Sequence, residues 1–204
     1  AMERATALYE KYPDDAMAMQ AIGNALIKAG DMAAARQIGL KLIDMSPENT
    51  SYLIMAAQTT LRTGCREEAI DYCNRLNKLT KNSPSSLLLH AEIYERSNMP
   101  DESDEILNRI KDAEEYTHLL HIARARVSQQ RKGYEEGIEH LKLAIDRINE
   151  MEVTQNTDDN LMEAWFLMAK SHDRMKQYDE AWASATKAHA VRPMEASPVL
   201  HKTS

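Results

Sequence analysis

Hydrophobic residues recur along this chain three, four and seven positions apart, the spacing that places side chains on one face of an α-helix. Met19, Ile22 and Leu26 show the pattern near the start, and Leu141 and Ala144 show it further on. The sequence therefore predicts an all-α fold. The positions expected to form its core are Met19, Ile22, Leu26, Leu42, Leu53, Ala56, Cys73, Leu76, Leu87, Tyr94, Leu107, Ile110, Leu141, Ala144, Trp165, Met168, Ala185 and Ala188.

Small residues recur with a longer period of 34 positions. The series starts at Gly23 and continues as Ala57, Ala91 and Ala125; a step of 44 then reaches Ala169, so ten residues are inserted before the last copy. A second small residue follows each of these after twelve positions, at Ala35, Ala69, Ser103, Gly137 and Ala181. Two helices approach closely only where side chains are small. Each copy is therefore expected to be a pair of helices in contact at these sites.

Residues that tolerate a left-handed backbone stand where each helix pair must reverse. Gly30, Gly64 and Asn98 occupy the same position in the first three copies, as expected for helix C-caps. In the fourth copy the turn is expected at Gly133, and in the fifth at Lys176 and Gln177.

This frame of large, small and apolar positions resembles the tetratricopeptide repeat (TPR). The residues that carry the resemblance best are those of the last copy: Trp165, Met168, Ala169, His172, Ala181, Ala185 and Pro193. The resemblance implies a right-handed superhelical α-solenoid of about five helix-turn-helix repeats plus an N-terminal half repeat. In the fourth copy, His121 and Arg124 depart from the family pattern by replacing apolar residues.

The period also gives the expected boundaries. They are 1–13 for the second helix of a partial repeat, 16–49, 50–83, 84–117 and 118–151 for four repeats, 152–161 for an inserted loop, 162–195 for the fifth repeat, and 196–204 for a C-terminal tail. The insertion is polar and acidic, and we expect it to lengthen the neighbouring helices and to form a loop between the fourth and fifth copies.

Composition narrows the classes of function. The 204 residues include 25 Lys and Arg against 32 Asp and Glu, and the net charge of −7 argues against nucleic acid as a partner. A mean hydropathy of −0.56 and the lack of a long apolar run argue against a membrane span. No signal peptide opens the chain, so a cytoplasmic location is expected. Cys65 and Cys73 are too far apart on one helix for a disulfide, and free thiols agree with that location.

No catalytic, cofactor or metal site is expected from the sequence. It contains no Gly-rich phosphate loop, no G-x-S-x-G and no H-E-x-x-H. His118 and His121 share one helical face and could coordinate a metal ion, but a pair without a third strong ligand favours a packing or surface role. His90 and His172 are expected at packing positions, as partly buried neutral side chains.

The resemblance implies that the first helix of each repeat lines a concave groove in which a peptide is bound. One row of groove positions is Asn24, Gln58, Glu92, Arg126 and Lys170, and the second row is Lys28, Arg62, Arg96, Gln130 and Arg174. Four of the five residues in the second row are cationic, which favours an acidic or carboxylate-ended peptide. A simpler alternative is that these cations only stabilise the helix C-termini.

The leading hypothesis is therefore a non-catalytic protein-interaction scaffold. A second hypothesis is the arm of a larger enzyme, because the stretch from Tyr178 to Arg192 is similar to repeats that precede sulfotransferase domains; any activity would then lie outside these residues. A third is a homodimer formed through unfinished repeat ends.

Overall fold

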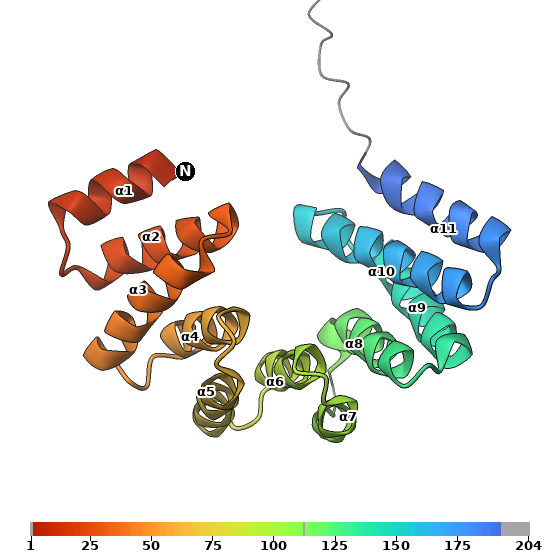
Figure 1. The fold of residues 1–204 in the computed structure, drawn as a ribbon, viewed down its shortest axis with the longest axis horizontal. Helices are drawn as coiled ribbons and strands as arrows, with labels where there is room; N and C mark the ends of the chain where they lie inside the picture. Colours follow the sequence, from red (N-terminus) through yellow and green to blue (C-terminus); the bar gives the residue numbers. More distant parts are fainter. Residues whose placement is uncertain (1, 112, 193–204) are drawn as a thin grey trace, which may run out of the picture. The chain divides into compact units, whose positions relative to one another are not determined.

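The computed structural model describes residues 2–111 and 113–192, and the elements in these residues are helices without a strand (Figure 1). The helices are α1 (Met2–Lys11), α2 (Ala16–Ala29), α3 (Met32–Met45), α4 (Thr50–Arg62), α5 (Arg66–Leu79), α6 (Pro84–Arg96), α7 (Pro100–Leu107), the 3₁₀ helix η1 (Glu114–Tyr116), α8 (Thr117–Gln130), α9 (Tyr134–Asn149), α10 (Gln155–Arg174) and α11 (Tyr178–Val191). The all-α repeat fold expected from the periodicity is confirmed.

The chain divides into two compact units, and each is described by itself. Unit 1 spans Ala1–Ala113 and unit 2 spans Glu114–Ser204. Pro193 and the expected tail at 196–204 lie outside the described residues. Within the described part, no helix is both long enough and apolar enough to cross a bilayer.

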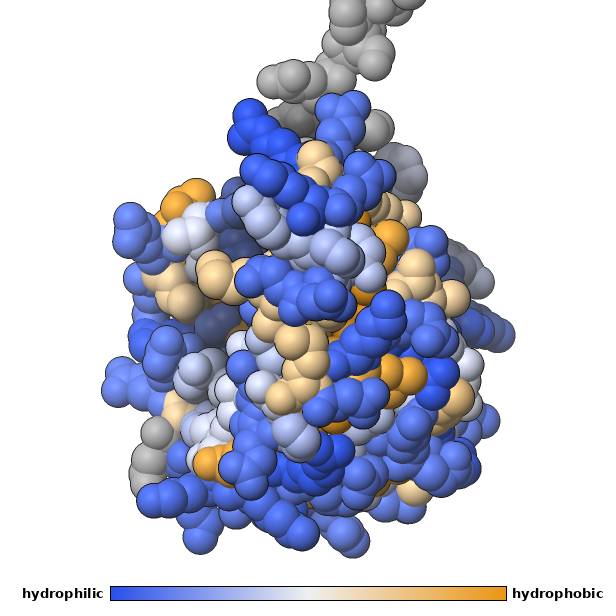
Figure 2. All heavy atoms as spheres, turned by 90° about the vertical axis from the view of Figure 1, so that its left-hand side faces the viewer, coloured by the Kyte–Doolittle hydropathy of each residue, from blue (hydrophilic) through white to orange (hydrophobic). Residues whose placement is uncertain are grey.

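In unit 1, α1 to α7 pack each on the next along the chain, and α2, α4 and α6 also contact one another in turn. We call these three the inner helices of unit 1. Leu42, Leu53 and Leu76 are buried at the centre of the core. Figure 2 views the side of the molecule on the left of Figure 1 and shows a mostly hydrophilic surface with small groups of hydrophobic residues.

In unit 2, α8 packs on α9, α9 on α10 and α10 on α11, while α8 also reaches α10. The core is built around Ile122, Leu141, Ile145 and Met168, all buried. It includes Ala144, which the helical spacing had assigned to the core.

The periodic small residues lie where paired helices touch. Ser103 of α7 is buried, and its Oγ donates a hydrogen bond of 2.8 Å to the carbonyl oxygen of Ala91 on α6. A Cβ atom on Gly137 of α9 would lie 3.4 Å from the carbonyl oxygen of Ala125 on α8. In both pairs the two residues are twelve positions apart in the sequence. The small side chains therefore allow the two backbones of a repeat to approach, as the period predicts.

A residue in the left-handed backbone conformation recurs at the same position of each repeat, even where the residue type changes. Within the repeats, the left-handed residues at the turns are Gly30 (φ 84°), Gly64 (φ 88°), Asn98 (φ 58°), Lys132 (φ 63°) and Lys176 (φ 63°). Lys81 and Asn82, between α5 and α6, are left-handed as well. The expectation that the fourth turn shifts to Gly133 is wrong. The left-handed residue there is Lys132, one step of 34 after Asn98, while Gly133 has a φ of −82° and is the N-cap residue that precedes α9.

The hydrogen bonds at the helix C-termini explain why the left-handed residue keeps the same position in each turn. In the first turn the Asp31 N–H donates to the Leu26 carbonyl, and in the fourth the Gly133 N–H donates to the Ser128 carbonyl. Both bonds span five residues, which is the Schellman pattern.

Lysine carries a cost in this conformation that glycine avoids. We expect Lys132→Gly to raise the free energy of unfolding by about 0.5–1 kcal/mol, because a Cβ is strained at positive φ. Chemical denaturation followed by circular dichroism measures this change. The matched control is Lys142→Gly inside α9, which should lower stability by about 1 kcal/mol. A destabilised Lys132→Gly variant would contradict the explanation.

The insertion at 152–161 forms a loop only in part. As expected, it lengthens a neighbouring helix, but α10 already begins at Gln155, so residues 155–161 are helical and the expected loop is corrected to the segment before them. Thr154 caps the helix: its Oγ1 accepts from the Thr157 N–H at 3.2 Å, and the Thr154 N–H donates to Thr157 Oγ1 at 2.7 Å. This reciprocal capping box satisfies two N–H groups and starts the helix early.

Candidate functional site

The inner helices of unit 1 form a pocket of about 150 Å³, which we call the central pocket. Apolar side chains such as Ile27, Leu61 and Ile93 contribute to its wall, and the polar groups come from α4 and α6. Its residues are Ile27, Met32, Gln58, Thr59, Leu61, Arg62, Leu89, Glu92, Ile93 and Arg96. Four of the predicted groove residues are thus brought together here: Gln58, Arg62, Glu92 and Arg96.

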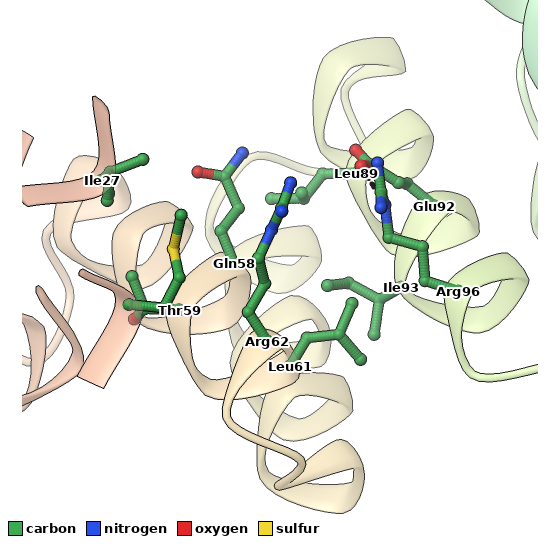
Figure 3. Close-up of a pocket in the computed structure, with 10 residues that line it drawn as sticks. Ile27, Gln58, Thr59, Leu61, Arg62, Leu89, Glu92, Ile93 and Arg96 are labelled. Atoms are coloured by element: carbon green, nitrogen blue, oxygen red, sulfur yellow. Dashed lines mark hydrogen bonds and ion pairs between the residues drawn. The ribbon is translucent and has the colours of Figure 1, made fainter. Parts of the chain in front are cut away.

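The polar residues of the central pocket are one helical turn apart on each helix. Figure 3 shows Gln58 and Arg62 extending in the same direction from successive turns of α4, with Glu92 and Arg96 on α6. Side chains four residues apart on a helix are neighbours on one face, so the 34-residue period aligns two polar pairs across adjacent helices.

The two arginines of the central pocket differ in electrostatic state. Arg96 Nε donates to Glu92 Oε1 at 2.7 Å, so its charge is largely balanced within the pocket. Arg62 is exposed and makes no hydrogen bond or ion pair with any described residue. The pocket therefore holds one uncompensated guanidinium next to an apolar wall.

Two further predicted groove residues, Asn24 and Lys28, lie in a different pocket. This second pocket has a volume of about 300 Å³ and lies on α1 and α2; we call it the N-terminal pocket. Its residues are Arg4, Ala5, Leu8, Ala21, Asn24, Ala25 and Lys28. Arg4 was not predicted as a site residue, although its place on a helix one repeat before the first full copy could have indicated it.

The remaining predicted groove residues belong to unit 2. Arg126 of α8 forms an ion pair with Glu163 of α10, so its charge is compensated by a partner that sequence reasoning missed. Gln130 at the end of α8 is partly buried, whereas Lys170 and Arg174 of α10 are exposed. Next to them, Gln129 Nε2 donates to the Leu167 carbonyl and to Ser171 Oγ, which joins α8 to α10.

The cationic row also has the location that the alternative explanation requires. Lys28, Arg62, Arg96 and Arg174 each lie in the last turn of their helix. A cation there interacts favourably with the helix C-terminus whether or not a ligand is bound. The position of the row is therefore compatible with a helix-stabilising role as well as with a binding role.

Two other candidate groups in unit 1, His90 and Cys73, are buried. His90 is 2% exposed, stacks on Tyr94 and accepts a 2.8 Å hydrogen bond from Asn77 Nδ2 at its Nδ1 atom, in the tautomer protonated at Nε2. Burial, assisted by the charge of Arg109, lowers the pKa of His90 to about 4. Burial also raises the pKa of the Cys73 thiol to about 12, so the thiolate that a nucleophile requires is absent at neutral pH.

The histidines of α8 pack rather than assemble a metal centre. His118 is buried, and His121 Nδ1 lies 3.1 Å from Nδ1 of His140 on α9. Burial lowers the pKa of both His118 and His121, with smaller contributions from nearby positive charge. Among the described residues, no group of three or more His, Cys, Asp or Glu side chains could hold a metal ion.

No protein-family model matches the chain, and no curated protein matches its sequence. Solved structures do match. TTC0263, a thermophilic TPR protein of Thermus thermophilus, is 18% identical with a TM-score of 0.74, covering 89% of this chain and 93% of that one. A chain of the APC/C hetero-tetramer Cut9–Hcn1 is 16% identical with a TM-score of 0.75; the match covers 92% of this chain, which spans only 35% of that chain.

YrrB, a TPR protein with an unusual peptide-binding site, is 13% identical with a TM-score of 0.53, covering 96% of this chain and 95% of that one. At these identities the likeness concerns the fold. The resemblance to TPR proteins seen in the sequence is thereby confirmed as a structural one.

Proposed function

We propose that this TPR-fold chain is a protein-interaction scaffold whose central pocket binds an acidic or carboxylate-ended peptide segment. The observation that carries the proposal is Arg62: an exposed guanidinium without a partner among the described residues, next to an apolar wall on the inner helices. Among similar structures, YrrB has a peptide-binding site and Cut9–Hcn1 is a protein assembly, which supports this class of function.

The chemistry of the central pocket suits a peptide. The Arg62 guanidinium can form two parallel hydrogen bonds to a carboxylate, and such charge-assisted pairs are among the stronger ones in proteins. The exposed Gln58 amide offers a donor and an acceptor to a peptide backbone. Leu89 and Ile27 offer apolar contact to a side chain of the ligand. The ion pair with Glu92 keeps the Arg96 guanidinium in a fixed orientation.

A peptide library tests the proposal while the partner is still unidentified. Random peptides displayed with a free C-terminus are selected on the wild-type chain, and the enriched peptides are measured by fluorescence anisotropy. We expect acidic sequences to be enriched. We also expect Arg62→Glu to weaken them by about tenfold or more, because a hydrogen bond to a charged group contributes roughly 1.5–3 kcal/mol. Arg62→Glu/Arg96→Glu should weaken them further.

The control variant is Lys41→Glu, an exposed charge reversal on α3 that changes the net charge equally. It should leave the affinity near the wild-type value. If Arg62 only stabilises the end of α4, Arg62→Glu will lower the stability of the chain by about 0.3–1 kcal/mol and leave peptide affinity unchanged. That result would refute the binding role.

A further inference from the structure

The residues inserted between the fourth and fifth repeats place a short extended segment on the surface of unit 2. Residues 152–154, between α9 and α10, form neither a helix nor a turn, and the Thr154 backbone is extended, with a φ of −135° and a ψ of 167°. The connection at 46–49 between α3 and α4, by contrast, contains a turn. Extended segments are one of the forms in which peptides bind to protein surfaces.

The backbone of this segment is held against the first turn of α10. The Thr154 N–H donates to Thr157 Oγ1 at 2.7 Å, and Thr157 Oγ1 also lies within hydrogen-bond distance of the Glu152 carbonyl oxygen, at 3.2 Å. Thr157 is buried, so these contacts fix the segment to the helix that follows it. A segment that is already held in one conformation loses less entropy on binding than a free peptide does.

The side chains of the segment are left exposed. Val153 is 81% exposed, the largest fraction among the exposed large hydrophobic residues of the described chain. Glu152 is also exposed, and its carboxylate has no hydrogen bond or ion pair with a described residue. A single exposed valine is common on protein surfaces. Here, however, the valine stands next to an uncompensated carboxylate in a fixed extended segment, and these are the features of an acidic peptide ligand.

The two side chains are complementary to the central pocket of unit 1. The pocket combines the uncompensated guanidinium of Arg62 with an apolar wall, whereas the segment combines an uncompensated carboxylate with an apolar side chain. A cavity of about 150 Å³, the volume of this pocket, takes up a molecule of the size of benzene, so a valine side chain fits. Opposite charges at matching places favour one partner and one orientation.

We infer that the segment at 152–154 of one copy binds in the central pocket of a second copy, so that the chain self-associates. This inference rests on the proposed function, because it names the partner of the same pocket. Glu152 pairs with Arg62, and Val153 packs on the apolar wall. The contact joins two different surfaces and is therefore heterologous. It involves neither end of the chain.

Light scattering at protein concentrations from about 1 µM to 1 mM measures the self-association. We expect the mass of the wild type to rise above the 23.2 kDa of one copy. Glu152→Arg and Arg62→Glu each bring like charges together and should weaken the association by at least about tenfold. The matched control is Glu48→Arg, the same charge reversal at an exposed residue of the turn between α3 and α4, which should associate like the wild type.

Mixing the two charge-reversal variants tests the pairing itself. A copy with Glu152→Arg keeps Arg62, and a copy with Arg62→Glu keeps Glu152, so opposite charges meet only between unlike copies. An equimolar mixture should therefore regain the association that each variant lacks. A contact within one chain would give no such recovery, because the two charges within each variant have the same sign. Circular dichroism of each variant verifies that the helices remain.

The inference is overturned if the wild type keeps the mass of one copy at every concentration, if Glu152→Arg associates like the wild type, or if the mixture shows no recovery. Its failure is distinguishable from that of the proposed function, because Glu152→Arg leaves the central pocket intact and should still bind the library peptides. A wild type that binds these peptides but does not associate overturns the self-association alone. Recovery in the mixture without any peptide enrichment supports self-association and overturns a free peptide as the ligand.

Discussion

Replacing Leu53 by Ala is expected to lower the free energy of unfolding by about 2–5 kcal/mol, the range for a leucine truncated in a close-packed core. Leu53 is 0% exposed and lies on α4 in the centre of unit 1, against the helices on both sides of it. The removed methyl groups lose their burial, and the cavity left behind loses contacts because rigid helices collapse into it only partly. Thermal and urea denaturation, followed by circular dichroism, measure the change.

The matched control is Leu79→Ala, the same substitution at the end of α5. Leu79 is 40% exposed, so its truncation should cost less than about 1 kcal/mol. Equal losses for the two variants would show that Leu53 is not at the centre of a packed core, and would contradict the repeat packing of unit 1.

Acidification is expected to destabilise the chain through His90, by about 3 kcal/mol between pH 6.5 and pH 4. The folded-state pKa is lowered from the usual 6.5 to about 4 by burial. Above pH 6.5 both states hold a neutral imidazole, and this group adds no pH dependence. As the pH falls, the unfolded state binds a proton that the folded state does not, so stability is lost until the folded pKa is reached.

The variant His90→Gln isolates this contribution. Glutamine keeps an acceptor for Asn77 Nδ2 but does not titrate, so the loss of stability on acidification should be smaller than in the wild type. It should not vanish, because His118 and His121 also have lowered pKa values and remain in place. Urea denaturation at a series of pH values gives both curves. Parallel curves would mean that His90 is not held neutral by burial.

The sequence predicted the helices and the turns well because both depend on local spacing. The 34-residue step carried the small residues from Gly23 to Ala125, and the left-handed turn followed the same step at Lys132. The turn was wrongly predicted at Gly133 because glycine is the residue type that favours a left-handed backbone, whereas the 34-residue step points to Lys132. The period fixes the geometry of the turn, and lysine tolerates it at a modest energetic cost.

Parts of the site could not be predicted because they depend on packing between distant residues. The Arg126–Glu163 ion pair joins helices across 37 positions, and the insertion breaks the period between them. Asn24 was expected in one row with Gln58, and Lys28 in a second row with Arg62. In the structure Asn24 and Lys28 also share a pocket with Arg4, because α1 contributes a wall that the two rows on the inner helices do not include.

The central claim is that the inner helices of unit 1 bind an acidic peptide through the central pocket. The most direct test is an NMR titration of the full chain, labelled at backbone amides and arginine side chains, with an acidic peptide selected from the library. We predict the largest shifts at Gln58, Arg62, Glu92 and Arg96, and the loss of these shifts in Arg62→Glu. Shifts concentrated instead on the second helices α3, α5 and α7 would contradict the claim.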